Sequence, residues 1–336
     1  MDCQMEQENE TASDVELIQQ AEELYGQERL LQAAEVLELV SNRENLFTDH
    51  HWMILKWADV VKKGMQDLLQ DPEQDGSPWI KQRETHGHRD FLVFYQLTDE
   101  NKLIARIDCA FETSLLNPLL SVFNESDLYS SWMPSFKRPI KVGVTKSQKL
   151  KEEGRGNQII QVTTSLAWPL YDRDLIMHVM AVDAIEDNNS SNDSDGGCIA
   201  IQALSETTND NPLIPAVDKN AVRIDFSNSM LIRACPPDHP CVVRSTNNDD
   251  DEPLILLSMM LEVDPKVRAV PQSIQNFITR TFLGRMWISL LHVAEDVRDG
   301  KRLAHKEKIE SNRELYSWIE ERVGVMIHNM QKLQKI

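Results

Sequence analysis

The sequence lacks an apolar run long enough to cross a bilayer. The longest nearly unbroken run, at 254–261, falls far short of the about 20 residues that a membrane-spanning helix needs. The first residues, MDCQMEQENETASDVE, are acidic and include no apolar stretch, so we expect no secretory signal peptide there. We therefore expect a cytoplasmic protein that is neither secreted nor embedded in a membrane.

Cysteine is scarce, and its five copies do not make a disulfide framework. Cys235 and Cys241 form the only close pair, on either side of a proline-rich segment. No second Cys or His pair completes the four ligands of a zinc site, and His86 and His88 lack a third ligand. We expect reduced thiols, no metal and no cofactor.

Basic residues are few relative to acidic ones. The chain of 336 residues has 35 Lys and Arg against 54 Asp and Glu, a formal net charge of −19. Such a surface repels phosphate backbones, which argues against nucleic-acid binding. With 41% hydrophobic and 26% charged residues, the composition is that of a globular protein with one large or two ordinary domains.

Catalytic motifs are also missing. The chain has no G-x-S-x-G elbow, Walker loop, H-E-x-x-H pair, G-x-G-x-x-G turn or cysteine-nucleophile signature. We therefore expect a binding protein and not an enzyme.

The N-terminal segment, residues 1–70, shows helical periodicity after about twelve polar residues that we expect to be frayed. Apolar residues recur every three or four positions over 15–25, 30–40 and 52–68, which predicts three amphipathic helices. The first two faintly resemble one tetratricopeptide-type hairpin. One such unit cannot bury its own face, so we expect it to pack on the main domain, with partner docking as the alternative.

The central segment, residues 75–299, reads as extended chain followed by a helix. It begins after a turn-rich linker at 71–78 and contains a short helix at 117–123. Strands are expected at 91–95, 103–113, 158–165, 174–184, 198–204, 221–235, 241–245 and 254–263. No long helix separates them, so the sheet must be mainly antiparallel. The longest helix then starts at Pro271 and continues to about Arg298, with Gly300 ending it.

The C-terminal segment, residues 302–336, predicts one more amphipathic helix. Its apolar residues follow a 3-4 spacing: Tyr316, Ile319, Val323, Met326, Met330 and Leu333. This seam is short for a coiled coil, so docking on the body is favoured over self-association. The predicted fold class is α+β: a curved antiparallel sheet wrapped on a long C-terminal helix, with added helices at both ends.

Two motifs resemble a known family. The stretch Trp168-Pro169-Leu170-Tyr171-Asp172-Arg173-Asp174-Leu175 is similar to the W-P-x-x-x-R-D stretch of START (steroidogenic-acute-regulatory-related lipid-transfer) domains. About ninety residues later, Asp264-Pro265-Lys266 and Val270-Pro271-Gln272-Ser273-Ile274-Gln275-Asn276 resemble that family's entry into its last helix. Val179 stands where sterol-binding members carry an arginine, and Ile160 lies near the place of its acidic partner. The resemblance covers about residues 75 to 299 and implies a helix-grip fold whose ligand differs from a sterol.

The resemblance also implies a lipid-binding cavity between the sheet and the last helix. The expected cavity lining is Trp132, Leu175, Met177, Val179, Ile224, Leu257, Met259, Leu261, Ile274, Ile278, Thr281, Phe282 and Arg285. The loop of Trp168, Pro169, Leu170 and Tyr171 would act with the last helix as a gate. Such a protein would bind, transfer or sense a lipid and contact membrane surfaces transiently.

Two further interpretations stay open. Lys266, Arg268, Arg280 and Arg285 either form a positive spot for anionic headgroups or pair with the chain's own carboxylates. The alternative function is a scaffold that recruits protein partners through the terminal helices while the central cavity is closed.

Overall fold

The computed structural model describes residues 2–85, 91–97, 103–137, 141–166, 170–185, 197–206, 212–242, 254–264, 266 and 282–333. The α-helices are α1 (Asp2–Tyr25), α2 (Leu30–Glu38), α3 (Arg43–Leu46), α4 (Asp49–Leu69), α5 (Leu116–Asn124), α6 (Tyr129–Trp132), α8 (Leu283–Arg298), α9 (Leu303–Ser311) and α10 (Arg313–Leu333). The strands are β1 (Ile80–Thr85), β2 (Phe91–Leu97), β3 (Leu103–Glu112), β4 (Val142–Glu153), β5 (Asn157–Leu166), β6 (Asp172–Ala184), β7 (Cys198–Ser205), β8 (Ala221–Arg223), β9 (Asp225–Ala234) and β10 (Leu254–Asp264).

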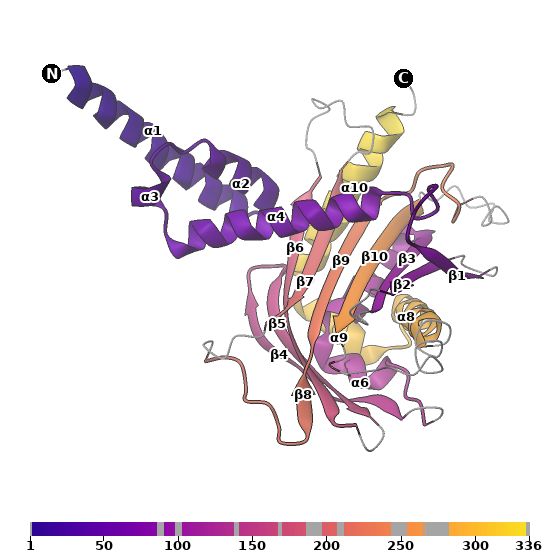
Figure 1. Ribbon diagram of the computed structural model, residues 1–336. Coiled ribbons are helices and arrows are strands. Elements are labelled where there is room, and N and C mark those ends of the chain that lie inside the picture. Colours follow the sequence, from indigo (N-terminus) through magenta and orange to yellow (C-terminus); the bar gives the residue numbers. More distant parts are fainter. Residues whose placement is uncertain are drawn as a thin grey trace.

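All ten strands belong to one curved sheet (Figure 1). Nine of them follow the order β1-β2-β3-β10-β9-β7-β6-β5-β4, and every neighbouring pair in that path is antiparallel. Strand β7 ends opposite Met177, and β8 then pairs in parallel with the first residues of β6. Beyond the end of β7, β8 therefore takes the position next to β6, and after Ile224 the chain continues as β9 on the other side of β7.

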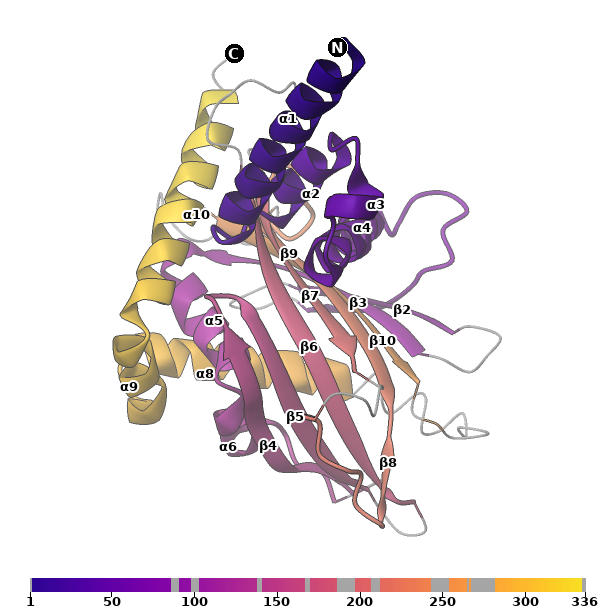
Figure 2. The same cartoon turned by 90° about the vertical axis from the view of Figure 1, so that its left-hand side faces the viewer.

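Helices cover both faces of this sheet (Figure 2). Because successive side chains of a strand point to opposite faces, β10 sends Ile255, Leu257 and Met259 to the concave face and Leu256 and Met260 to the other. We call these the inner and the outer face. α5, α6, α8 and α10 pack on the inner face, and α4 lies across the outer face. The predicted helix-grip α+β fold is confirmed.

The N-terminal helices dock on the outer face. Leu30, Ile54 and Val61 share one buried cluster with Met180 and Val182 of β6. α1 begins at Asp2 and not near residue 13, because no Gly or Pro interrupts its polar first half and Glu and Gln favour helix. Asp14 is buried within α1, and its carboxylate accepts hydrogen bonds from the backbone N–H groups of Ser41 and Asn42 at 3.0 Å each.

One strand expectation is wrong. The 221–235 run is extended as predicted, but it is divided at Ile224 into the two strands β8 and β9. Cys241 and Val242 form a turn, where a strand over 241–245 was expected. The N–H of Val242 donates to the carbonyl of His239, so the proline-rich segment closes on itself. Residues 243–245 lie outside the described residues.

The C-terminal segment docks on the body, as favoured. Tyr316, Ile319, Val323 and Met326 of α10 belong to the same buried cluster as the inner face. Gly300 ends α8 in the left-handed region (φ +72°), and the N–H of Lys301 reaches back to the carbonyl of Asp296 at 2.8 Å. Both terminal segments pack on the same sheet as the central segment. The division of the chain into three domains, 1–70, 75–299 and 302–336, stays a prediction.

Gly64 allows α4 to approach the outer face. A Cβ on Gly64 would lie 2.5 Å from Ser229 Oγ and 3.0 Å from Gln202 Oε1. Gly→Ala in a helix interior ordinarily stabilises by about 1 kcal/mol, but at this position we expect Gly64→Ala to lower the free energy of unfolding by about 1–3 kcal/mol through overpacking. Gly324→Ala in α10 is the control, because nothing lies within 4 Å of its Cβ, and it should stabilise. Urea denaturation of both variants checks this; stabilisation by Gly64→Ala would contradict the close docking.

Candidate ligand-binding site

The inner face gathers most of the predicted cavity residues that the structure describes. Five of them are buried members of one apolar cluster: Trp132, Met177, Leu257, Met259 and Leu261. Three more are partly buried and pack against that cluster: Leu175, Val179 and Phe282. They come from α6, from β6, from β10 and from the residue just before α8, so segments distant in sequence build one apolar wall.

Other predicted lining residues stand apart. Ile224 lies at the break between β8 and β9, outside this cluster, and its N–H donates to the carbonyl of Asp174 at 3.1 Å. The Arg285 side chain is exposed, and its guanidinium lies 5.8 Å from the centre of the Phe136 ring. Ile274, Ile278 and Thr281 lie outside the described residues, as does the expected helix start at Pro271.

α8 packs on the inner face through Trp287 and Ser289, which were not among the predicted site residues. Trp287 is fully buried and packs near Phe123 of α5, with their ring centres 6.5 Å apart. The hydroxyl of Ser289 donates to the carbonyl of Trp132 at 3.0 Å, which ties α8 to α6. The period-3.6 pattern indicated a buried stripe, but it could not say which of its members meet α5 and which meet the sheet.

Two polar atoms in this apolar wall have no partner among the described residues. The indole N–H groups of Trp132 and Trp287 are buried and donate no hydrogen bond to any of them. An unsatisfied buried donor costs about 1–3 kcal/mol. The wall therefore offers two donors that an acceptor on a bound molecule could satisfy.

α9 and α10 cover the rest of the inner side through a polar seam. Glu125, buried beyond the end of α5, accepts from the Tyr316 hydroxyl at 3.3 Å and lies 3.5 Å from the Lys308 ammonium. Asn117 donates to the Glu320 carboxylate at 2.6 Å. Farther along α10, Arg322 pairs with the buried Asp183 of β6 at 2.6 Å.

Two histidines with lowered pKa values, the partly buried His178 and the buried His305, make stability depend on pH. Burial lowers the pKa of His178, whose ring lies 4.8 Å from that of Trp57, and the pKa of His305 in α9. Below about pH 6.5 the unfolded chain takes up protons that these folded groups refuse, so stability is lost as the pH falls through that value. We expect the free energy of unfolding to fall between pH 7 and pH 5, measured by urea denaturation.

The double variant His178→Gln, His305→Gln should flatten this slope, whereas His292→Gln, at an exposed position, should leave it unchanged. Equal slopes in all three proteins would contradict the assignment.

The start of β6 carries exposed apolar side chains. Leu170 and Tyr171 of the predicted gate loop are 37% and 59% exposed. The N–H of Asp172 donates to the carbonyl of Asn220, which joins the start of β6 to the chain just before β8. We call Leu170 and Tyr171 the apolar tip. Trp168 and Pro169 lie outside the described residues.

Arg173 and Asp174 of the family-like motif point to opposite faces and do not pair with each other. Asp174 binds Arg223 at 2.7 Å and accepts from Gln161 and Thr163, which fixes the β8 crossing. Arg173 donates to the carbonyl of Tyr171 at 2.6 Å. Both residues of the motif therefore hold the ends of the loop and strand in place.

Comparison with known proteins finds similarity only to solved structures. No family model and no curated protein matches the chain. A STAR-related lipid transfer protein from Xanthomonas axonopodis is 16% identical, with 65% of this chain and 99% of that chain covered and a TM-score of 0.43. Human STARD10 is 14% identical (78% and 86% covered, TM-score 0.48), and the human StarD13 lipid transfer and protein localization domain is 13% identical (74% and 98% covered, TM-score 0.40).

The described residues include neither a membrane-spanning helix nor a cluster of metal ligands. None of their helices combines the length and apolar content needed to cross a membrane. Among the same residues, no three His, Cys, Asp or Glu side chains converge as a metal site would require.

Proposed function

We propose that the protein binds a lipid or similar hydrophobic molecule against the inner face, under α8. The observation that carries this proposal is the single apolar wall formed by Met177 of β6, Leu257 and Met259 of β10 and Trp132 of α6. A lipid chain of about 16 carbons costs about 13 kcal/mol in water, at about 0.8 kcal/mol per methylene. An apolar wall gripped by a helix removes that cost and leaves opening as the slow step of transfer.

The polar end of the ligand is an uncharged hydrogen-bond acceptor in this proposal. Val179 and Ile160, at the positions where sterol-binding members of the family that the sequence resembles carry an ion pair, both belong to or pack on the apolar cluster. The unpartnered indole N–H groups of Trp132 and Trp287 favour an acceptor such as an ester carbonyl.

Lipid retention tests the function directly. The purified chain, incubated with a total lipid extract, should carry lipid in native mass spectrometry, at one lipid per chain. Leu175→Trp, which narrows the inner side, should reduce the retained fraction several-fold, and Leu204→Trp, on the outer side against the N-terminal helices, should not. Absence of retained lipid in the unmodified chain would refute the proposal.

The gate in this proposal consists of α8 and the loop of Trp168 to Tyr171, and the apolar tip is where it meets a membrane. Tyr suits a membrane–water boundary because its ring is apolar and its hydroxyl is polar. Lys266, one of the four basic residues first considered for this role, pairs with Asp225 and with Asp264. That pairing favours insertion of the tip over attraction through Lys266.

Charging the tip should slow transfer. Because Leu170 and Tyr171 are exposed, Leu170→Asp with Tyr171→Asp should leave stability nearly unchanged and slow lipid transfer between vesicles by tenfold or more. Val15→Asp with Leu39→Asp is the matched control, since these apolar side chains are also exposed, in α1 and just after α2. Transfer of fluorescent lipid, followed by loss of quenching, measures both; equal rates in the two variants would rule out the tip as the contact.

A further inference from the structure

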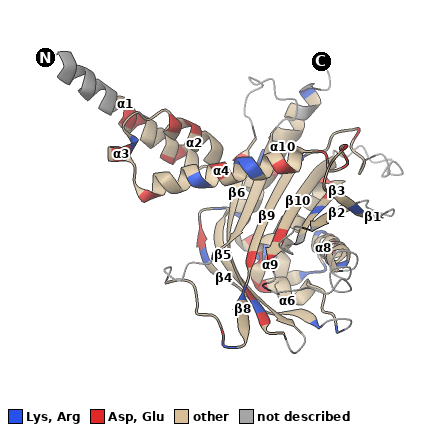
Figure 3. Ribbon diagram, in the orientation of Figure 1, with Lys and Arg blue, Asp and Glu red and all other residues tan. Residues whose placement is uncertain are grey.

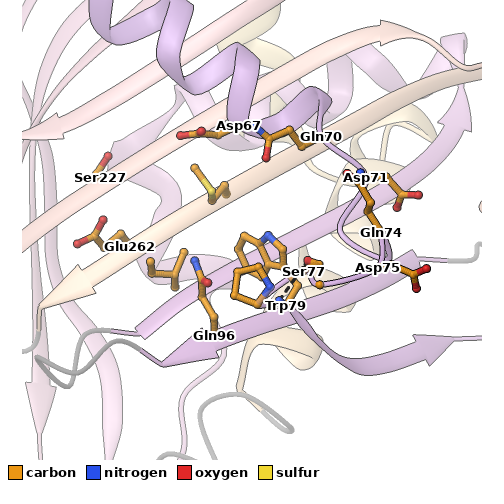
Figure 4. A pocket seen from close by; sticks show the side chains of 14 residues that line it. Asp67, Gln70, Asp71, Gln74, Asp75, Ser77, Trp79, Gln96, Ser227 and Glu262 are labelled. Atoms are coloured by element: carbon orange, nitrogen blue, oxygen red, sulfur yellow. Dashed lines mark hydrogen bonds between the residues drawn. The ribbon is translucent and has the colours of Figure 1, made fainter.

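A pocket of about 510 Å³ lies on the outer face, on the side of the sheet opposite the proposed lipid site. Its floor comes from the sheet: Gln96 of β2, Ile104 of β3, Ser227 of β9, and Met260 and Glu262 of β10. Its wall is the end of α4 with the 70–79 segment that follows (Figure 4). The volume falls within the range of about 300–1,000 Å³ typical of small-molecule sites.

The lining combines an aromatic ring with carboxylates. The Trp79 indole is half-buried near the middle of the pocket, with Asp67 and Glu262 toward one end and Asp71 and Asp75 toward the other (Figure 4). Among the described residues that line the pocket, none is a Lys, Arg or His. The pocket therefore presents negative charge around an apolar centre.

The carbonyls at the end of α4 are satisfied from within the protein. α4 has 21 residues and no basic residue in its last turn, so its last carbonyls need donors from elsewhere. Arg106 lies beneath, buried, and donates to Asp108 and to the carbonyls of Leu68 and Gln70 at 2.8 and 2.7 Å. Because its guanidinium binds Asp108 and these carbonyls, it is not directed at a ligand in the pocket.

The separation of the carboxylates from one another favours an organic cation over a metal ion. A metal ion needs several oxygens converging at 2.0–2.6 Å, and the described residues hold no such group. An organic ammonium needs only diffuse negative charge and an aromatic face within about 6 Å. Ile104 and Met260 supply apolar contact for a carbon body.

We propose that this outer pocket binds a small organic cation, an ammonium group carried on an aryl or alkyl body. The ring of Trp79 faces the cation, and Asp67, Asp71 and Asp75 supply negative charge toward the two ends of the pocket. This site is separate from the lipid site and does not depend on the proposed function.

Three probes with one carbon body and different charge test the proposal: 4-phenylbutylamine, 4-phenylbutanol and 4-phenylbutanoate. In NMR titrations of the full chain, the amine should shift the Trp79 indole N–H and the backbone of residues 70–79. The alcohol should bind about tenfold more weakly, and the carboxylate should not bind. Added salt should weaken the amine only.

Charge variants separate this site from non-specific attraction to an acidic protein. Asp67→Asn with Asp75→Asn should weaken the amine about tenfold and leave the alcohol unchanged. Glu73→Gln is the control, since Glu73 lies in the same loop but pairs with Lys81 at 2.7 Å and does not line the pocket. Trp79→Leu should weaken the binding of amine and alcohol alike. Trp79 also packs on a buried cluster, so this variant can unfold. In that case the variant of the exposed Asp75, Asp75→Asn, tests the site by itself.

Three outcomes would overturn the inference: equal affinity for amine and alcohol, equal effects of Glu73→Gln and the aspartate pair, or amine shifts confined to inner-face residues. Tighter binding of millimolar Ca²⁺ at residues 70–79 would also overturn it, by making the pocket a metal site. None of these bears on lipid retention, so the two proposals can fail separately.

Discussion

Replacing Arg106 with Met should lower the free energy of unfolding by about 3–5 kcal/mol, the cost of breaking a buried ion pair from one side. Arg106 and Asp108 of β3 are 4% and 2% exposed, and the guanidinium donates to both carboxylate oxygens, at 3.2 and 3.0 Å. Without it, Asp108 is a buried charge with no partner. The last carbonyls of α4 also lose their donors, so we expect α4 to fray at the edge of the outer pocket.

Arg298→Met is the control for that variant. Arg298 also pairs with a β3 carboxylate, Glu112, at 2.6 Å, but both side chains are partly exposed, so the loss should stay below about 1 kcal/mol. Denaturant unfolding with linear extrapolation measures both variants. The double variant Arg106→Met, Asp108→Asn should recover part of the loss, because it removes the stranded charge; no recovery would show that the α4 carbonyls carry the whole effect.

Replacing Arg322 with Met should release α10 from the sheet and cost about 3–5 kcal/mol of its docking. The guanidinium donates to the carbonyl of Ile185 at 2.9 Å and pairs with Asp183, which is 1% exposed. Asp183 belongs to β6, so this pair spans 139 residues of sequence. Amide hydrogen exchange should show faster exchange throughout α10 with little change in β3 and β10.

Asp183→Asn is the rescue for that variant. Asparagine keeps an acceptor for the N–H of Ile185, which bonds to Asp183 at 3.0 Å, but carries no charge. The pair Arg322→Met, Asp183→Asn should therefore regain most of the protection, while Glu314→Gln at the exposed start of α10 should change nothing. If the double variant exchanges as fast as Arg322→Met alone, the buried charge is not what holds α10 in place.

Sequence patterning predicted the strands that are covered on both sides and missed those at the edges. β10 was found because 254–263 is almost wholly apolar, as a strand buried on both faces must be. β1 (IKQRET) and β4 (VGVTKSQKLKEE) are the two edge strands, and their charged, mostly polar sequences carry little of that signal. Lysines on an exposed edge also guard against pairing with another chain. Pairing with β2 and β5, not local preference, makes these segments extended.

The candidate lipid site was partly visible in the same way. Alternation along β10 identified Leu257, Met259 and Leu261 as one side of a strand, and all three lie in the inner cluster. Trp287 was missed because helical spacing marks a buried stripe without saying which residue fills the gap against α5. The outer pocket was not foreseen at all, since its lining comes from α4, the 70–79 segment and four strands.

By itself, the sequence determined the element types with strong periodicity, the antiparallel character of the sheet and the absence of catalytic motifs. Each follows from local spacing or composition, which a single strand or helix already carries. The expectation of a helix-grip fold came from the resemblance of two motifs to a known family. Only the tertiary structure decided that Arg106 caps α4, that Asp183 pairs with Arg322, and that carboxylates of α4 and of its following loop line one pocket with Trp79. These are contacts between residues tens to hundreds apart, and they exist only because the curved sheet brings its two faces against different helices.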